Sequence, residues 1–157
     1  MQVLLFGASD SDSRDKSMHV TVAYNHFGKR LSQRMPRCRW GFFHLVNNDY
    51  THWQMYAVGG SKGATIISQG NRFIAPPNPN FKQVTHRNDA TPDEWKKWTW
   101  RSEGDLMMNG AFMIESGNPD WAKGYHDYQL VKPLPATMVG KITKFSGTLS
   151  CKKGKAC

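Results

Sequence analysis

The sequence Asn25-His26-Phe27 returns as Asn48-Asp49-Tyr50 and again as Asn71-Arg72-Phe73, so that an Asn-X-aromatic unit recurs every 23 residues. The residues before each unit follow the same register and alternate between apolar and polar. One aligned set is Val20, Phe43 and Ile66, and a second is Val22, Leu45 and Ser68. A period of this size, with one strand leading into an Asn turn, favours the stacked coils of a parallel β-helix.

The residue types in the repeat suit such a stack. Aligned Asn side chains can hydrogen-bond to their equivalents in the coils above and below, and aligned aromatic rings can stack in the interior. Asn also tolerates the left-handed backbone that a sharp corner requires. A sandwich of antiparallel hairpins is the main alternative, but the repeat region has none of the Asn-Gly or Asp-Gly turns typical of hairpins.

The chain after Ala75 is expected to differ from the repeat region. We therefore divide a single domain, residues 1–157, into coils over 1–75 and a loop-rich covering tail over 76–157. Thr91-Pro92-Asp93-Glu94 predicts the start of a short helix, with a capping box and with proline in the first helical position. Further strands are expected over 110–114 and 140–149.

The first residues, Val3-Leu4-Leu5-Phe6-Gly7, read as a strand that opens without a capping unit. A solenoid needs such a unit to cover its open end. We therefore expect a β-helix truncated on its N-terminal side. No signal-peptide pattern and no apolar run long enough to span a bilayer is visible in the sequence.

The charge of the chain points to a polyanionic partner. The sequence has 157 residues, is 39% hydrophobic and carries a formal net charge of +9. Nucleic acid, an anionic membrane surface and an acidic polysaccharide all fit this charge, and so does a merely solvated basic surface. No nucleic-acid motif is readable, and the six histidines show no zinc-binding spacing.

The candidate chemistry lies in the segment Arg34-Met35-Pro36-Arg37-Cys38-Arg39-Trp40-Gly41. Arg37 and Arg39 would share one face of a strand, and Arg34 would precede the bend at Pro36. Guanidinium groups match carboxylates with two parallel hydrogen bonds, so the cluster suits a carboxylate ligand. Structural ion pairs to acids of the same chain are the alternative.

The motif Arg34-X-Pro36-Arg37-X-Arg39-X-Gly41 resembles the signature of the plant pectate lyases, the family that includes the ragweed and cedar types of pollen allergen. The resemblance extends over residues 2–115. The other segments that carry it are Gly7-Ala8-Ser9-Asp10-Ser11, Val20-Thr21-Val22-Ala23-Tyr24-Asn25, Tyr56-Ala57-Val58-Gly59-Gly60-Ser61, Ser68-Gln69-Gly70-Asn71-Arg72-Phe73, Trp98-Thr99-Trp100-Arg101-Ser102-Glu103-Gly104-Asp105 and Asn109-Gly110-Ala111. The resemblance implies an all-β fold, a right-handed parallel β-helix.

It also implies an activity: calcium-dependent β-elimination on de-esterified pectin by a secreted, monomeric protein of the plant cell wall, with no nucleic acid or membrane as partner. Arg34 takes the family's place of the base, Arg39 that of the carboxylate-binding arginine, and Arg37 is a further candidate for substrate binding. A guanidinium normally stays protonated in proteins, so Arg34 either needs close cations and exclusion of water or acts by stabilising the developing enolate.

Two departures from the family pattern bear on activity. Gln2 stands where the family commonly has a substrate-binding lysine, and the family's calcium-binding aspartates lie upstream of every residue present. Asp10, Asp12 and Asp15 fail the EF-hand pattern and are interpreted as a solvated turn, so no metal ligand is predicted. A catalytically inactive remnant that at most binds acidic polysaccharide is therefore the second hypothesis, and a basic nucleic-acid-binding module is the third.

The cysteines are assigned by position. Cys38 is expected to be a small buried residue. Cys151 and Cys157 lie close enough in sequence for a terminal disulfide, which the family resemblance also fits, although two free thiols remain the alternative.

Overall fold

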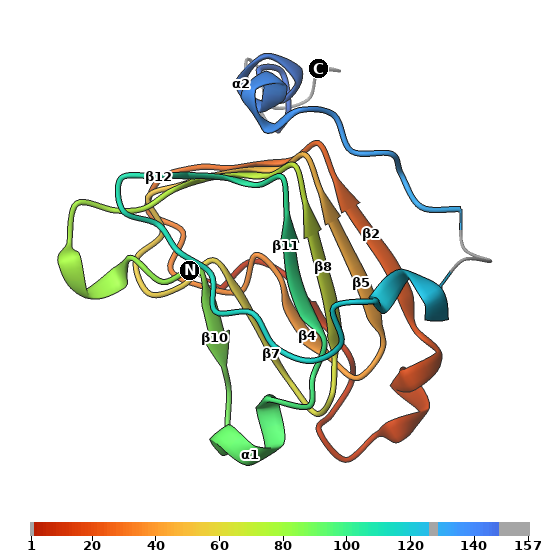
Figure 1. Cartoon of the computed structure of the whole chain (residues 1–157). Helices are drawn as coiled ribbons and strands as arrows, with labels where there is room; N and C mark the ends of the chain where they lie inside the picture. The colour runs from red at the N-terminus through yellow and green to blue at the C-terminus, as the bar shows by residue number, and fades with distance from the viewer. Residues whose placement is uncertain (1, 126–128, 148–157) are drawn as a thin grey trace, which may run out of the picture.

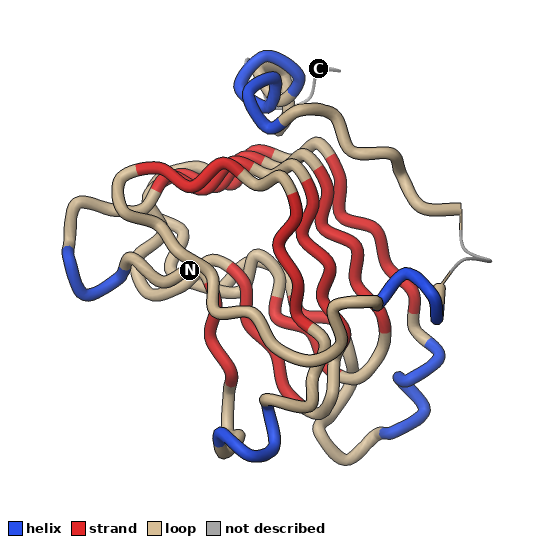
Figure 2. The backbone as a smooth tube through the Cα atoms, viewed as in Figure 1, coloured by secondary structure: helices blue, strands red, loops and turns tan. Residues whose placement is uncertain are grey.

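Three parallel sheets form the faces of a β-helix in the computed structural model, which describes residues 2–125 and 129–147 (Figures 1 and 2). Each sheet has four strands, and the chain visits the three sheets in turn. The first sheet contains β1 (Leu5–Phe6), β4 (Arg37–Arg39), β7 (Val58–Ser61) and β10 (Thr85–Arg87). The second contains β2 (His19–Ala23), β5 (Phe42–Val46), β8 (Thr65–Gln69) and β11 (Trp100–Glu103). The third contains β3 (His26–Phe27), β6 (Asp49–Thr51), β9 (Arg72–Ile74) and β12 (Leu106–Met108).

The strand register confirms the predicted parallel β-helix. Val20 pairs with Phe43, and Phe43 pairs with Ile66, as the 23-residue alignment requires. At the corner between the second and third sheets, Asn48 Oδ1 accepts hydrogen bonds from the backbone N–H and the side chain of Asn25, both at 3.0 Å. Asn71 Oδ1 accepts the equivalent pair from Asn48. The repeated Asn residues therefore form a continuous ladder.

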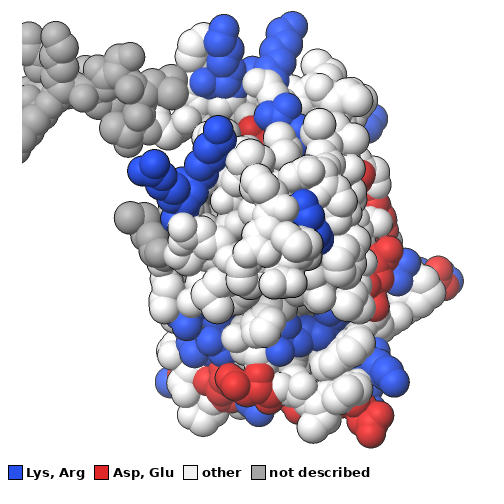
Figure 3. All heavy atoms as spheres, turned by 90° about the vertical axis from the view of Figure 1, so that its left-hand side faces the viewer, with Lys and Arg blue, Asp and Glu red and all other residues white. Residues whose placement is uncertain are grey.

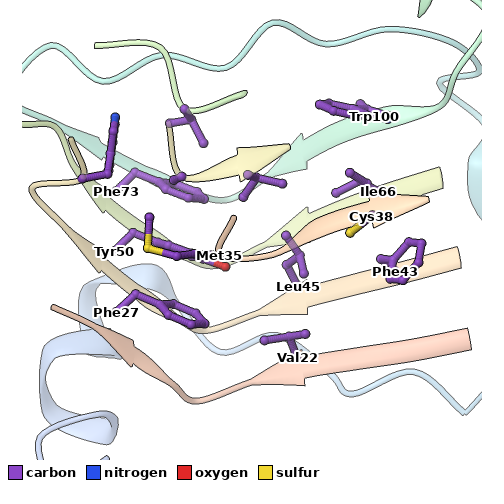
Figure 4. Packing of buried hydrophobic residues seen from close by; sticks show 14 of the residues in the cluster. Val22, Phe27, Met35, Cys38, Phe43, Leu45, Tyr50, Ile66, Phe73 and Trp100 are labelled. Atoms are coloured by element: carbon purple, nitrogen blue, oxygen red, sulfur yellow. The ribbon is translucent and has the colours of Figure 1, made fainter. Parts of the chain in front are cut away.

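Aromatic rings stack inside the coils beside this ladder (Figure 4). The ring centroids of Phe27 and Tyr50 lie 4.9 Å apart, and those of Tyr50 and Phe73 lie 4.6 Å apart, with nearly parallel planes. All three side chains are buried, together with Phe43 and Ile66 from the second sheet. The first three coils thus each add one aromatic ring to a shared core, and the burial of this apolar surface stabilises the stack.

The coils continue past the boundary expected at residue 75. Strands β10, β11 and β12 pair in parallel with the preceding strands of all three sheets. Asp105 replaces asparagine in the ladder and accepts from the Asn71 N–H at 2.7 Å. The sequence repeat was lost because this residue type differs and because the 23-residue spacing grows to 34 residues. The covering tail begins only after Met108.

The segment between β10 and β11 contains the short helix that was predicted. This helix, α1 (Pro92–Trp95), has proline at its start, but the Thr91 side chain makes no capping hydrogen bond. Short 3₁₀ helices complete the connections. They are η1 (Ser13–Ser17), η2 (Pro79–Phe81), η3 (Trp121–Gly124) and η4 (Ala136–Met138).

Both strands predicted in the tail were wrong. Residues 110–114 lie in a turn and irregular backbone, with only an isolated bridge between Phe112 and Gln83. Within 140–147 the chain is helical at first, as α2 (Val139–Ile142). A Cβ at Gly140 would lie 2.7 Å from the Arg72 guanidinium, so this helix packs closely on the third sheet. In the described part of the chain, no helix is long and apolar enough to cross a membrane.

Candidate functional site

Strand β4 places two of the three clustered arginines on the outer face of the first sheet. Cys38 between them points into the core and is fully buried, and burial raises the pKa of its thiol well above the usual range (Figure 4). Because side chains alternate along a strand, Arg37 and Arg39 share the opposite face. The shared face and the buried cysteine are as predicted.

Arg39 is held by acids and carbonyls of its own chain. Its Nε donates to Asp10 Oδ1 at 2.7 Å, and its Nη1 donates to the Gly7 carbonyl at 3.1 Å. Asp10 Oδ1 also accepts from Ser61 Oγ at 2.9 Å. Burial of the Asp10 carboxyl opposes its ionisation, but the hydrogen bonds from Ser61 and Arg39 outweigh this and lower its pKa. The interpretation of Asp10 as part of a solvated turn was therefore wrong.

The two other acids of that segment also have partners. Asp12 forms an exposed ion pair with Arg14, in which Nη2 and Oδ2 lie 2.7 Å apart. Asp15 Oδ2 accepts a hydrogen bond from the Ala8 N–H, also at 2.7 Å. Among the described residues, no group of three or more His, Cys, Asp or Glu side chains could hold a metal ion.

Arg37 lies under a cover of side chains and is only 7% exposed. Its Nη2 lies 3.8 Å from the carboxylate of the exposed Asp89, which makes a long ion pair, and its buried Nε has no hydrogen-bond partner. This environment combines an anion at a distance with a spare donor. Arg37 thus lies beside the other arginines of the cluster, and not all of its N–H donors are used by hydrogen bonds within the chain.

Arg34 stands at the bend that leads into β4. Its backbone has a φ of 66°, and the peptide bond between Met35 and Pro36 that follows is cis. Together with Gln2 and Leu4, Arg34 lines a small hollow of about 210 Å³. Its buried Nε has no hydrogen-bond partner, and the guanidinium forms no ion pair with a described residue. Arg34 is thus the member of the cluster that lacks an internal carboxylate.

Two aromatic residues complete the site, and sequence reasoning missed both. The rings of Tyr56 and His86 stack with centroids 4.9 Å apart. The ring of Tyr56 occupies the space above Gly59, where a Cβ would lie 2.6 Å from it. Burial raises the pKa of Tyr56, against the opposing effect of the nearby Arg34 guanidinium. Burial and then the charge of Arg37 lower the pKa of His86.

The strand register explains this gathering. Arg37 on β4 pairs with Gly59 on β7, which pairs with His86 on β10. One row across the outer face therefore carries the guanidinium of Arg37, then the Tyr56 ring in the space over Gly59, and then the imidazole of His86. Tyr56 and His86 lie 30 residues apart in the sequence. Their contact follows from the pairing of β7 with β10, and β10 lies in the coil where the sequence repeat is lost, so the sequence did not predict it.

The wider surface has both signs of charge. Lys and Arg side chains form a band across the lower part of the face shown in Figure 3, and Asp and Glu side chains lie directly beside it. On this surface, individual ion pairs therefore decide which cations are available to a ligand. The Cys151–Cys157 pairing lies outside the described residues.

A family model described as pectate lyase matches residues 1–105. The chain belongs to the pectate lyase family. It is 59% identical to the probable pectate lyase P59 of Solanum lycopersicum and 60% identical to a pectate lyase of Nicotiana tabacum, in each case over 99% of its own length. It covers 35% and 40% of those two proteins, so it spans little more than a third of the curated pectate lyases that it matches.

Solved pectate lyase family structures share the fold. The crystal structure of Jun a 1, the major allergen from cedar pollen, matches 95% of the chain with a TM-score of 0.88 and 40% identity, and the chain covers 43% of that structure. A pectate lyase variant from Xanthomonas campestris matches with a TM-score of 0.63 and 19% identity, which supports the fold alone. The recognition of the plant pectate lyase family and of its parallel β-helix is thus confirmed.

Proposed function

We propose that this chain forms the arginine-bearing part of a pectate lyase, which cleaves de-esterified pectin by β-elimination. The observation that carries the proposal is Arg34, a guanidinium without an internal carboxylate at the edge of a hollow on the outer face of a pectate lyase fold. A polygalacturonate chain carries a carboxylate on every sugar, and such a polyanion supplies what Arg34 lacks.

In the reaction, a base takes up the C5 proton beside a galacturonate carboxylate. The electron pair of that C–H bond forms the C4–C5 double bond, and the C4–oxygen bond breaks. The departing oxygen takes up a proton and becomes a hydroxyl, so the products are an unsaturated uronide and a shortened chain. Negative charge develops on the carboxylate in the transition state, as an enolate.

In this proposal Arg34 acts where that charge develops. A donor already fixed at the position of a developing oxyanion lowers the barrier, because it needs no reorganisation during the reaction. The left-handed backbone and the Pro36 bend fix the start of the side chain, and the Tyr56 ring lies close to the guanidinium. The role of base, which the family resemblance gives to Arg34, requires in addition that water be excluded from this guanidinium.

Arg39 and Arg37 are proposed as auxiliary carboxylate contacts. Arg39 has its Nε–H and one Nη1–H engaged by Asp10 and Gly7, so only its second Nη1–H and its Nη2 can serve a ligand. Arg37 can offer donors only after its cover shifts or Asp89 turns away. Both therefore rank below Arg34 as points of contact, and Asp10 is a positioning partner for Arg39.

Calcium is the cofactor that the family resemblance implies for this reaction. The acids of the described residues near the arginines are engaged in ion pairs or hydrogen bonds within the chain, and they do not fit a calcium site. The remaining parts of the proposal, a monomer secreted to the plant cell wall with polygalacturonate as partner, rest on the family.

A second candidate function is binding of acidic polysaccharide without cleavage. The specific observation in its favour is the same lack of a calcium-binding acid cluster among the described residues. The guanidinium groups would still recognise carboxylates in that case.

Incubating the chain with polygalacturonate and calcium, and following the ultraviolet absorbance of the unsaturated product, tests both functions. We expect an absorbance gain that falls by about 100-fold or more in Arg34→Gln, since a fixed donor to a developing oxyanion is worth that much. Arg14→Gln, an exposed arginine paired with Asp12, is the matched control and should keep the wild-type rate. Pectate binding without any absorbance gain would support the second function, and loss of both would reject the two.

A further inference from the structure

A second and larger hollow lies where three successive turns between the third and first sheets meet. Its volume is about 430 Å³, within the range of small-ligand sites. The turn before β4 supplies Lys29 and Arg30, the turn after β6 supplies His52, and the turn after β9 supplies Pro76, Pro77 and Phe81. Consecutive coils thus build one concave surface.

Hydrogen bonds between the turns hold this hollow open. Trp53, which forms part of its wall, is buried, and its Nε1 donates to the Phe81 carbonyl at 2.8 Å. Ser32 Oγ donates to Gln54 Oε1 at 2.7 Å, and the Gln54 N–H donates to the Leu31 carbonyl. The walls are therefore preformed, and a ligand would not have to order them on binding.

The charge of the hollow is uncompensated. Lys29 and Arg30 are exposed, and neither forms an ion pair with an acid of the described residues. No Asp or Glu lines the hollow. Arg39 and Arg72, in contrast, each have a carboxylate of the chain within 2.8 Å. A site with two free cations beside proline and phenylalanine walls suits an anion with an apolar face.

We propose that this hollow is an accessory subsite for a uronate sugar of the polymer whose other end lies at Arg34. The identity of the ligand rests on the proposed function, but the existence of an anion site does not. Lys29 and Arg30 bind the sugar carboxylate, and Pro77 and Phe81 contact the apolar face of the ring.

A single polymer can reach both places. Arg30 and Arg34 lie four residues apart on one turn, so their Cα atoms are separated by at most about 14 Å. In this proposal a galacturonate oligomer that occupies the hollow near Arg34 continues into the larger one. The subsite would add affinity for long oligomers and little for short ones.

The double variant Lys29→Gln/Arg30→Gln tests the subsite by its dependence on oligomer length. Binding of a trigalacturonate and of a much longer oligogalacturonate is measured by calorimetry. We expect the variant to bind the long oligomer about tenfold more weakly, from two lost charge-assisted contacts, and the trimer unchanged. Lys96→Gln/Lys97→Gln removes the same charge at two exposed lysines after α1 and should bind like the wild type.

Equal affinity of the two double variants for the long oligomer overturns the inference, whatever the lyase assay shows. Failure of the proposed function gives a different pattern, in which no product forms but the length-dependent binding is kept. The indole N–H resonance of Trp53 in ¹⁵N-labelled protein gives a second measurement: it should shift with the long oligomer, and an unchanged resonance counts against the subsite. Stronger binding of RNA than of polygalacturonate at this hollow would also reject it.

Discussion

Asp105 ends a ladder whose other members are asparagines. Its side chain is half-buried and accepts from the Asn71 N–H, from Ser68 Oγ and from Ser102 Oγ. Burial nevertheless dominates and raises the pKa of Asp105 to about 6. The folded protein therefore binds a proton here more tightly than the unfolded chain does. Stability is lost as the pH rises from about 4 to about 6, because the carboxylate must ionise in a buried place.

Asp105→Asn should remove this pH-dependent loss. The amide oxygen can accept from Asn71 as the other asparagines of the ladder do, and no charge is buried. We expect the variant to exceed the wild type in unfolding free energy by about 2–3 kcal/mol at pH 8 and to match it more closely near pH 4. Urea denaturation between pH 4 and pH 8 measures the difference. Asp120→Asn, at an exposed acid, is the control, and an Asp105→Asn variant no more stable than wild type at pH 8 would contradict the pKa assignment.

The Asn ladder is the element that fixes one corner of every coil. Asn48, in its middle, is fully buried and uses both ends of its amide: Oδ1 accepts from Asn25, and Nδ2 donates to the Val22 carbonyl and to Asn71. Removing this side chain takes a donor away from the buried Val22 carbonyl and from the buried Asn71 Oδ1, and it takes the acceptor away from the part-buried Asn25 N–H. Each such group costs about 1–3 kcal/mol.

Asn48→Ala should therefore destabilise the protein by about 3–5 kcal/mol, measured as unfolding free energy in urea. Asn25→Ala is the matched control. Asn25 is exposed and stands at the end of the ladder, so its loss leaves solvated groups and should cost about 1 kcal/mol or less. Equal losses at the two positions would mean that the ladder is not the stabilising element.

The same element shows what can be predicted from sequence. The coils over 1–75 were predictable because one residue type returns at a constant spacing. The last coil was not, because Asp105 replaces the asparagine after a longer insertion that contains α1. The arginine motif marked the site, but the partner of Arg39 is Asp10, which lies 29 residues upstream on the preceding coil. Contacts between coils leave no local signal where the repeat is absent.

At the scale of the whole molecule, the described tail residues 129–147 lie as a strap over the corner of the coils that holds the Asn ladder (Figure 1). Asn47 binds it with two hydrogen bonds of 2.8 Å: Nδ2 donates to the Leu134 carbonyl, and Oδ1 accepts from the Leu134 N–H. A Cβ at Gly70 would lie 2.6 Å from the same carbonyl, so the strap also depends on a glycine. Further on, Ser146 Oγ donates to the Tyr24 carbonyl.

Asn47→Gly should release the strap and leave the coils folded. Glycine tolerates the φ of 51° at this position, so the substitution removes the amide without backbone strain. We expect trypsin to cleave the tail at Lys141 and Lys144 about tenfold faster, from the loss of two hydrogen bonds of ordinary strength. Limited proteolysis followed by mass spectrometry measures the rates.

Asn109→Gly is the matched control. Asn109 also has a left-handed backbone, with a φ of 55°, but its side chain donates to the Ala75 carbonyl and not to the strap. It should leave the cleavage rate at the two lysines unchanged. Similar rates in the two variants would show that Asn47 does not hold the tail.

The row formed by Arg37, Gly59 and His86 has a further consequence, because neighbouring strands of a sheet lie about 4.8 Å apart. The molecule can therefore change length only in whole steps of that size. Inserting a second copy of residues 48–70 would add one such step, keep the Asn register and move His86 one step farther from Arg37. A set of variants with one, two or three inserted coils would show how the affinity for a polymer depends on the length of the outer face.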